Sequence, residues 1–423
     1  MYKSFIFRNK IHRVDKWMKI FFILILYFLI YPIKIKFIIP VPIHMLFLPF
    51  ILIKYKEIYL KNRFNFYYSL NTIFIIIISI IIILFSEYKD MYYINYYILQ
   101  IMNINIAYLM VKILKKSKIK GEKALEYLLY AILLDFITVF FIKINPSCLF
   151  VINKVVFIPK ESLEIINSNI YYRFLGLGGK FFGGGVIAGY GVLLSTYLYL
   201  NDFKKKYFII LVLCFFYGIL LARTTIISLV LSFFMAIIVV FNKNKKKMKC
   251  ISFIFKLIIL IFTIYFIIYL FFRETRFGYW VLEILGIFFE KKPRSVNSLI
   301  NLLENIKKVE IQDIILGNGK WKYGLEEISI LRTDIGYYRI LFYSGIIGFF
   351  LFLFNYIYFY CKLIKISWKI GFKNVVFSYL LLLYYMVINI KGFVTLNFIV
   401  FFILNIFLEQ SKRIKKGEKY EKN

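Results

Sequence analysis

The sequence predicts an all-α polytopic membrane protein with about 12 transmembrane helices and two long extracytoplasmic loops. Three observations lead to this fold class. The chain of 423 residues is 61% hydrophobic, more than a soluble protein of that length can cover with a polar surface. Apolar stretches near the roughly 20 residues that cross a bilayer core recur along it. Lys and Arg collect in every second connection between these stretches.

The composition also excludes several classes of function. The net charge of +34 is spread over short basic runs between apolar stretches, which is typical of contact with an anionic cytoplasmic leaflet and not of nucleic-acid binding. None of the four cysteines forms a CxxC pair and only two histidines exist, so we expect no metal site and no cofactor. Cys148 is the only cysteine on the predicted outer side, which implies no structural disulfide.

Twelve apolar stretches are predicted to be helices, because lipid leaves only helices and closed barrels for the backbone and these runs lack the alternation of barrel strands. The second stretch contains Pro40, Pro42 and Pro49 and is the weakest of the set. In chain order the stretches are Trp17–Ile33, Phe37–Ile53, Phe66–Phe85, Met91–Val111, Ala124–Ile142, Phe181–Leu200, Tyr207–Leu221, Thr225–Phe241, Ile251–Phe272, Ile335–Tyr360, Val375–Ile390 and Phe393–Leu408.

Basic residues orient these helices. An excess of Lys and Arg marks cytoplasmic connections, and here it predicts both termini in the cytoplasm. No small-residue cleavage site follows the basic N-terminus, so the first stretch is predicted to be an anchor and not a signal peptide. The basic connections are Lys3–Lys19, Lys54–Arg63, Lys112–Lys123, Lys204–Lys206, Lys243–Lys249, Lys362–Lys373 and Lys412–Lys416.

The predicted organisation alternates helices with two outer loops. Its parts are 1–142 with helices 1–5, 143–180 as the first long extracytoplasmic loop, 181–272 with helices 6–9, 273–334 as the large extracytoplasmic loop, 335–408 with helices 10–12, and 409–423 as a basic cytoplasmic tail. The large loop is rich in acids with interleaved Lys and Arg, and Leu299, Leu302 and Ile306 fall on one face of an expected surface helix. The alternative is a solvated lid without chemistry.

Arginines on the predicted outer side are candidate anion ligands, because guanidinium binds phosphate through two parallel hydrogen bonds. A structural ion pair or a lipid-headgroup contact is the alternative for each; for Arg173 and Arg332 we favour a functional role. The outer arginines are Arg173, Arg223, Arg273, Arg276, Arg294, Arg332 and Arg339.

Two further features lie near the membrane. The glycine-rich stretch Gly176–Gly191 is not a P-loop, since no Ser or Thr follows its lysine; helix packing is expected for its later glycines, and Gly176–Gly184 could expose N–H groups to an anion. Asp135 lies deep in the fifth span, either as a proton relay or, as we favour, as a hydrogen-bonded partner of Asn103 or Asn105.

Three segments together resemble the O-antigen polymerase (Wzy) family of bacterial surface-polysaccharide assembly. Arg173 to Gly184 has the Arg-x10-Gly spacing of that family's first long loop. The segment GILLARTTIISLVLSF, residues 218–233, looks like its small-residue/Arg/Thr signature, with Arg223 as the arginine. The segments ILGNGKWKYG and RTDIGYYRILFYSGIIGFF look like its GxG and Thr-Asp-x-Gly patterns, and Arg332 to Gly348 has the spacing of the second long loop.

The resemblance implies a glycosyltransferase of the cytoplasmic (inner) membrane whose substrate is undecaprenyl-diphosphate-linked oligosaccharide, as in O-antigen, lipopolysaccharide or capsule synthesis. It implies Arg173, Arg223, Arg332, Arg339, Gly184 and Gly348 as contacts to the diphosphate, with Asp334, Arg173 and Arg332 as catalytic residues. Glu326 and Glu327 are reserves for the base. Membrane lipid, a chain-length regulator and a flippase are the implied partners.

Three other interpretations of the same features stay open. A lipid-linked oligosaccharide flippase also has about twelve spans, but the chain shows no internal repeat and few intramembrane charges. An O-antigen ligase of the same superfamily would place a histidine in the large outer loop, where this chain has none. A purely structural partner in a polysaccharide complex is the third alternative.

Overall fold

The regular elements in the described part of the chain are helices. The computed structural model describes residues 17–32, 36, 42–60, 62–86, 90–145, 154, 156, 181–242, 247–272, 311–321 and 335–415. Within them the labelled elements are η1 (Ile43–Phe47), α2 (Leu48–Ile53), η2 (Lys56–Leu60), α3 (Arg63–Phe85), α4 (Tyr92–Lys116), α5 (Gly121–Ile144), α8 (Phe181–Asp202), α9 (Lys205–Leu221), α10 (Thr225–Phe241), α11 (Lys247–Phe272), α14 (Ile311–Leu316), α15 (Gly336–Ile370), α16 (Phe372–Lys391) and α17 (Phe398–Lys415), preceded by a helix over Trp17–Ile30.

Seven of the described helices are long and apolar enough to cross a membrane, namely α3, α4, α5, α8, α11, α15 and α16. Two others, α9 and α10, have 17 residues each, the lower end of what a crossing helix needs. α17 begins at Phe398 and not at Phe393 as predicted, because Phe393–Asn397 form a non-helical link. The predicted class, a polytopic helical membrane protein, agrees with this architecture.

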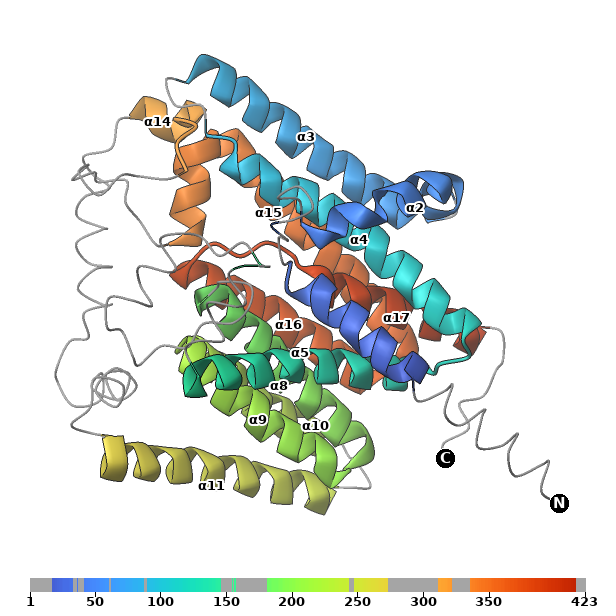
Figure 1. Cartoon of the computed structure of the whole chain (residues 1–423), viewed down its shortest axis with the longest axis vertical. Helices are drawn as coiled ribbons and strands as arrows, with labels where there is room; N and C mark the ends of the chain where they lie inside the picture. The colour runs from blue at the N-terminus through green and yellow to red at the C-terminus, as the bar shows by residue number, and fades with distance from the viewer. Residues whose placement is uncertain are drawn as a thin grey trace.

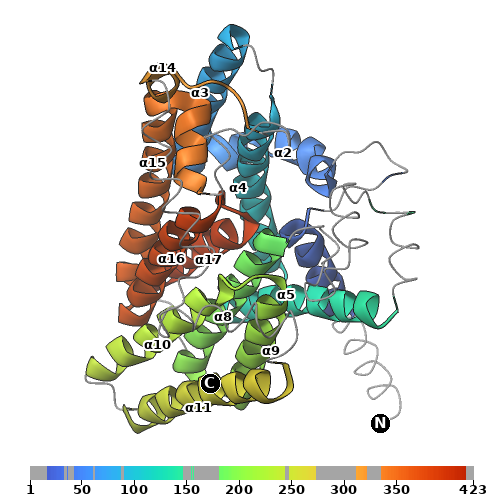
Figure 2. The same ribbon diagram turned by 90° about the vertical axis from the view of Figure 1, so that its left-hand side faces the viewer.

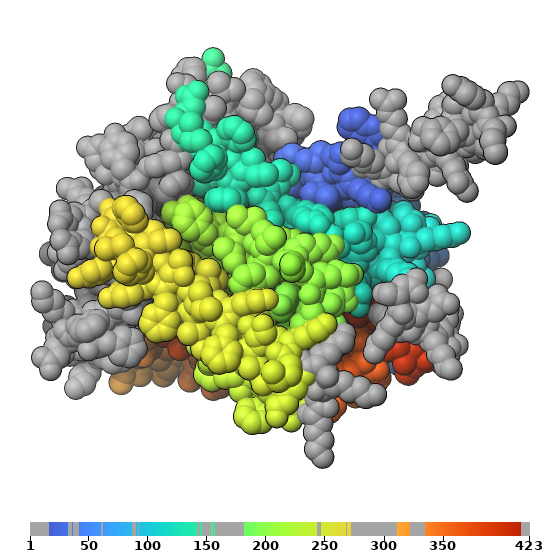
Figure 3. All heavy atoms as spheres, turned by 90° about the horizontal axis from the view of Figure 1, so that it is seen from below, coloured from blue at the N-terminus to red at the C-terminus, as the bar shows by residue number. Residues whose placement is uncertain are grey.

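Burial separates the helices that pack inside from those that face lipid. α8 is central: it packs against α5, α9, α10 and α16, and almost all of its length is buried. Its small residues permit this, since a Cβ on Gly191 would lie 2.9 Å from the Cys214 sulfur. α11 instead contacts mainly α10 and lies at the surface of the bundle (Figure 3). It exposes Phe255, Phe262 and Phe266. Exposed aromatic and aliphatic side chains of this kind are what hydrocarbon solvates best.

Connections predicted to share a side of the membrane meet in space. At one end of the bundle Lys112 pairs with Glu57, Lys115 pairs with Glu409 at 2.5 Å, and Lys373 donates to the Leu200 carbonyl. At the other end the α3–α4 connection reaches residues 318–321, where the Trp321 N–H donates to Asp90 Oδ2 at 3.2 Å. This sorting is the one that the basic connections predicted; that the first of these ends faces the cytoplasm remains a prediction.

The second predicted span is much shorter than expected. Its described part consists of the 3-10 turn η1 and the six residues of α2, and a π-helical turn, η2, follows. A helix of six residues rises only about 9 Å, against a hydrocarbon core of about 30 Å. Pro42 directly precedes η1, and Pro49 lies in the first turn of α2. Proline is tolerated at the start of a helix but not in its interior, so both positions favour short helical pieces. The described residues of Phe37–Ile53 therefore do not form one crossing helix.

α15 is a bent element and not the straight span predicted over Ile335–Tyr360. At Gly345 the backbone takes φ +63°, and the helical conformation stops there and resumes afterwards. The chain folds back at this residue, so that the ring of Tyr337 lies 6.4 Å from those of both Phe349 and Phe352. The short arm, Gly336–Ser344, lies below α14 and beside the long arm (Figures 1 and 2). The crossing part of α15 therefore starts after Gly345.

Asp135 links three helices inside the membrane. Its Oδ1 accepts from the Tyr27 hydroxyl at 3.1 Å and from the Thr138 hydroxyl at 3.2 Å, and its Oδ2 accepts from the Tyr217 hydroxyl. The predicted partners, Asn103 or Asn105, were wrong: the donors found for Asp135 are Tyr27, Thr138 and Tyr217, and Asn105 donates instead to the Tyr59 hydroxyl at 2.6 Å. A buried carboxylate with several donors is satisfied, so these contacts favour the structural role over a proton relay.

We expect Asp135→Ala to destabilise the folded protein by about 3 kcal/mol, because it leaves two buried tyrosine hydroxyls without their acceptor. Asp135→Asn keeps one carbonyl oxygen and should lose about half as much. Thermal unfolding in detergent measures both. A stable Asp135→Asn protein that has lost its activity would favour the proton relay instead.

Candidate functional site

The predicted site residues divide into two groups. Arg173, Arg332 and Asp334 lie outside the described residues, so their roles stay predictions. Arg223, Arg339, Gly184 and Gly348 are described, and the structure places each of them at the end of the bundle where the α3–α4 connection lies or in the helices that lead there.

The first two predicted motif segments pack against each other. A Cβ on Gly184 would lie 2.8 Å from Leu221 Cδ1, and one on Gly185 would lie 2.5 Å from the Ala222 Cβ. The Thr225 hydroxyl donates to the Gly185 carbonyl at 3.0 Å. Arg223, half-buried, occupies the turn between α9 and α10 beside this contact. The glycines of α8 thus let the α9–α10 turn approach closely, and a substrate contact for Gly184 stays a prediction.

The third motif segment forms a loop that caps the short arm of α15. Gly317 and Gly319 have φ of +81° and +68°, a conformation that side chains with a Cβ rarely adopt. The Asn318 N–H donates to the Phe342 carbonyl at 2.8 Å and the Gly319 N–H to the Tyr343 carbonyl at 3.1 Å. These carbonyls belong to the last turn of the arm, where helix carbonyls lack partners within the helix. The GxG loop therefore supplies donors to the end of the arm, in a backbone conformation that its two glycines permit.

Trp321 follows that loop and is buried among aromatic rings, with only 2% of its surface exposed. Its ring centroid lies 4.7 Å from Phe393, 5.0 Å from Tyr93 and 5.7 Å from Tyr343. The guanidinium of Arg339, on the short arm, lies 5.2 Å from the centre of the Trp321 ring. Such a cation–π contact is worth about 0.5–2 kcal/mol, depending on how far it is removed from water.

Gly348 serves a different purpose from the arginines. It is buried, and a Cβ there would lie 2.3 Å from the Ser344 Cβ, across the turn of α15. The glycine allows the two arms of α15 to approach each other, and its predicted contact with substrate stays a prediction.

The turn between α16 and α17 connects the first motif segment with the third. A Cβ on Gly392 would lie 2.7 Å from the ring of Phe182, in the first turn of α8. A Cβ on Gly336 would lie 2.8 Å from the Gly392 carbonyl, and the next residue, Phe393, stacks edge-on against Trp321. Described parts of the first and third motif segments thus meet around Gly392 and Phe393, and the second segment packs against the first at Gly184 and Gly185.

The sequence did not point to Asp90 or Trp321. In the sequence Asp90 is an acid in the short connection between α3 and α4. In the structure its carboxylate accepts from the Trp321 N–H and its carbonyl accepts from the Tyr343 hydroxyl. A tryptophan directly after a glycine-rich turn was the available signal, but only the fold shows which residues surround it. Within the described part of the chain, no three His, Cys, Asp or Glu side chains come together as a metal site.

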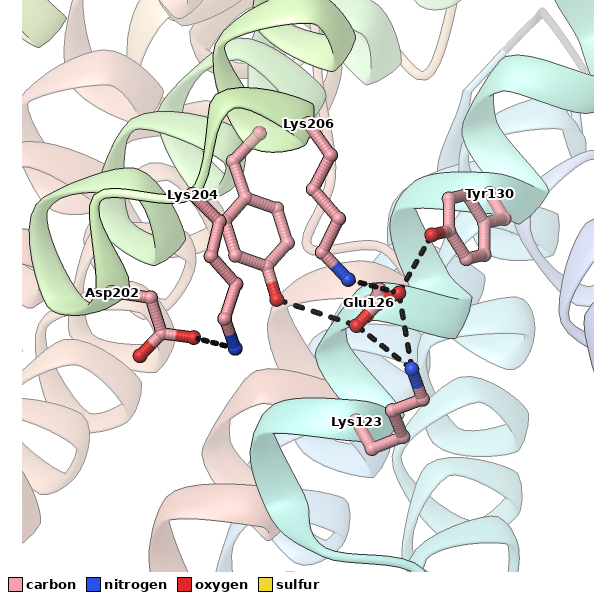
Figure 4. A network of polar contacts seen from close by, with 7 residues as sticks. Lys123, Glu126, Tyr130, Asp202, Lys204 and Lys206 are labelled. Carbon is pink, nitrogen blue, oxygen red and sulfur yellow. Dashed lines mark hydrogen bonds and ion pairs between the residues drawn. The ribbon is translucent and has the colours of Figure 1, made fainter. Parts of the chain in front are cut away.

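The opposite end of the bundle carries a separate polar network (Figure 4). Glu126 on α5 accepts from Lys206 at 2.7 Å, from Tyr130 at 2.6 Å and from Lys123 at 3.2 Å. Tyr207 donates to the other oxygen at 3.3 Å, while Asp202 pairs with Lys204. Because Lys206 and Tyr207 belong to α9, the network ties α5 to the start of α9. Its carboxylate is fully engaged, which argues for a structural role at this end.

The fold and the site together define the class: a polytopic helical membrane protein with an arginine- and glycine-bearing site at one end of its bundle. Comparison of the chain with protein-family models, with curated proteins and with solved structures gives no match.

Proposed function

We propose that the protein polymerises lipid-linked oligosaccharide repeat units on the extracytoplasmic face of the bacterial cytoplasmic membrane. In each step the growing glycan leaves undecaprenyl diphosphate and joins the non-reducing sugar of a new repeat unit. The proposal starts from the resemblance of three segments to the O-antigen polymerase family. It is supported by the polytopic helical fold, which suits a substrate with a long lipid tail.

One structural observation carries the proposal. The first and third resembling segments are far apart in the sequence, yet their described parts meet around Gly392 and Phe393 at one end of the bundle, and the second segment packs against the first at Gly184 and Gly185. Arg223 and Arg339 belong to these parts, at the end opposite the Glu126 network. Unrelated matches of arginine and glycine at fixed spacing would not be expected to gather in this way.

The chemistry needs positive charge on the leaving group and a base for the acceptor. The bond between the anomeric carbon and the diphosphate oxygen breaks, and the diphosphate leaves with the electron pair. The acceptor hydroxyl oxygen forms the new glycosidic bond, and its proton passes to the base. We assign Arg173 and Arg332 to the diphosphate, Arg223 and Arg339 to further anion contacts, and Asp334 to the base. No nucleotide is needed.

The test is a gel profile of surface glycan from a deletion strain, with lipid-linked intermediates analysed alongside. We expect glycan limited to a single repeat and accumulation of the single-repeat lipid carrier. Loss of all outward-facing repeats, with intermediates trapped on the cytoplasmic side, would identify a flippase and reject the polymerase. Complementation with the wild-type chain is the control.

A further inference from the structure

Trp321 is fixed from several directions. Its backbone N–H donates to Asp90 Oδ2 at 3.2 Å, and the loop before it is hydrogen-bonded to the last carbonyls of the short arm of α15. Rings from α4, from α15 and from the link before α17 enclose its side chain. The indole therefore has a defined position relative to the short arm, which carries Arg339.

Arg339 is a half-buried cation that has no carboxylate partner among the described residues. Its side chain is partly removed from water, and among the described residues no Asp or Glu lies within ion-pair distance of it. Its one contact of electrostatic kind in the described structure is with the face of Trp321. A charge partly withdrawn from water without a counter-ion is unfavourable, and an anion from outside the chain would relieve that cost.

The position of the guanidinium over the Trp321 ring leaves it suited to such an anion. A guanidinium lying over an aromatic face keeps the N–H groups at its edge, in a planar fork that matches two oxygens of a phosphate. Without the ring beneath it, a long arginine side chain would sample many rotamers and lose entropy on binding. Trp321 removes that freedom in advance.

We propose that Trp321 is a positioning residue that holds the Arg339 guanidinium as a preformed contact for a diphosphate group. The positioning stands on the geometry alone; the source of the diphosphate, the lipid-linked substrate, rests on the proposed function. Trp321 itself is buried and does not touch the ligand.

The experiment measures stabilisation of the purified full chain by inorganic pyrophosphate, from thermal unfolding in neutral detergent. Wild-type protein should show a concentration-dependent rise in Tm. Arg339→Gln should lose that rise. Trp321→Leu should weaken the apparent affinity for pyrophosphate about tenfold, because the aromatic ring beneath the guanidinium is removed. Trp321→Phe keeps an aromatic face and should stay within about threefold of wild type. Arg339→Lys should be weaker than wild type because it loses the fork.

Trp368→Leu is the matched control. Trp368 lies on α15, the helix that carries Arg339, and is 64% exposed, so this variant should respond to pyrophosphate like wild type. Arg339→Gln also controls for folding, because it leaves the Trp321 packing intact. Three results would overturn the proposal: no pyrophosphate response in wild type, an unchanged response in both Trp321→Leu and Arg339→Gln, or equal loss in Trp321→Phe and Trp321→Leu. Stabilisation by phosphatidylglycerol in nanodiscs, without any by pyrophosphate, would identify a lipid headgroup and also overturn it.

This readout separates the inference from the proposed function. If the deletion strain shows no polymerisation defect while the pyrophosphate response depends on Trp321 and Arg339, the anion contact stands and the polymerase does not. If the polymerase phenotype is found but the two variants respond like wild type, the polymerase stands and the positioning role does not.

Discussion

Gly345→Ala is expected to destabilise the folded protein by about 3 kcal/mol, combining left-handed backbone strain with overpacking. The residue has φ +63°, and a Cβ would lie 2.4 Å from the Ile315 carbonyl oxygen and 2.6 Å from the Leu316 carbonyl carbon. Both are backbone atoms of α14, so neither can turn aside. The loop over residues 317–319 is hydrogen-bonded to the same arm, and moving α14 would disturb it. Thermal unfolding in detergent measures the loss.

Gly371→Ala is the matched control for this substitution. Gly371 has φ +152° but nothing lies within 4 Å of a Cβ there, so only backbone strain is introduced. We expect it to lose clearly less stability than Gly345→Ala. Equal losses would mean that the close approach of α14 does not matter, and that the fold at Gly345 tolerates more movement than its contacts indicate.

Arg173→Ala and Arg332→Ala are each expected to slow polymerisation by 10²- to 10³-fold, about 2–4 kcal/mol in the transition state. Under the proposed function each guanidinium neutralises charge on the departing diphosphate, and that charge grows as the glycosidic bond breaks. Arg→Lys at either position should also slow polymerisation, because an ammonium cannot form the paired hydrogen bonds that a guanidinium makes to a phosphate. Conversion of single-repeat lipid carrier to longer glycan, followed in membranes, measures the rate.

Arg413→Ala serves as the control for removing a cation. Arg413 lies at the end of α17, 3.9 Å from Glu409 and at the opposite end of the bundle from Trp321 and Arg339, so polymerisation should be unchanged. Full activity in both Arg173→Ala and Arg332→Ala would end the assignment of these arginines to the diphosphate.

Much of the fold follows from patterns along the chain. Apolar stretches near bilayer length predicted the described helices α3, α4, α5, α8, α11 and α16 closely, because in lipid every backbone group must be paired inside its own segment. The basic runs predicted which connections meet, and the pairs of Lys112 with Glu57 and of Lys115 with Glu409 agree with that grouping. These signals are local, so a sequence carries them without any knowledge of packing.

The site was predicted less completely. Glycine and arginine spacing brought Gly184, Arg223 and Arg339 to attention, and the structure gathers the segments that hold them. The residue spacing did not single out Trp321 or Asp90, because their importance depends on which residues of α4 and α15 surround them. Arg173, Arg332 and Asp334 remain predictions from the motif spacing.

The class of protein, the approximate limits of most helices and the sorting of the connections could be predicted from the chain alone, since each depends on hydropathy and charge over neighbouring residues. Three features depend on the packing of the helices: the fold-back of α15 at Gly345, the tyrosine partners of Asp135 and the contact of Arg339 with the Trp321 ring. Each of these features involves contacts between residues distant in the chain, and hydropathy does not predict such contacts. They arise because close-packed helices place particular side chains together and leave room only for certain residues.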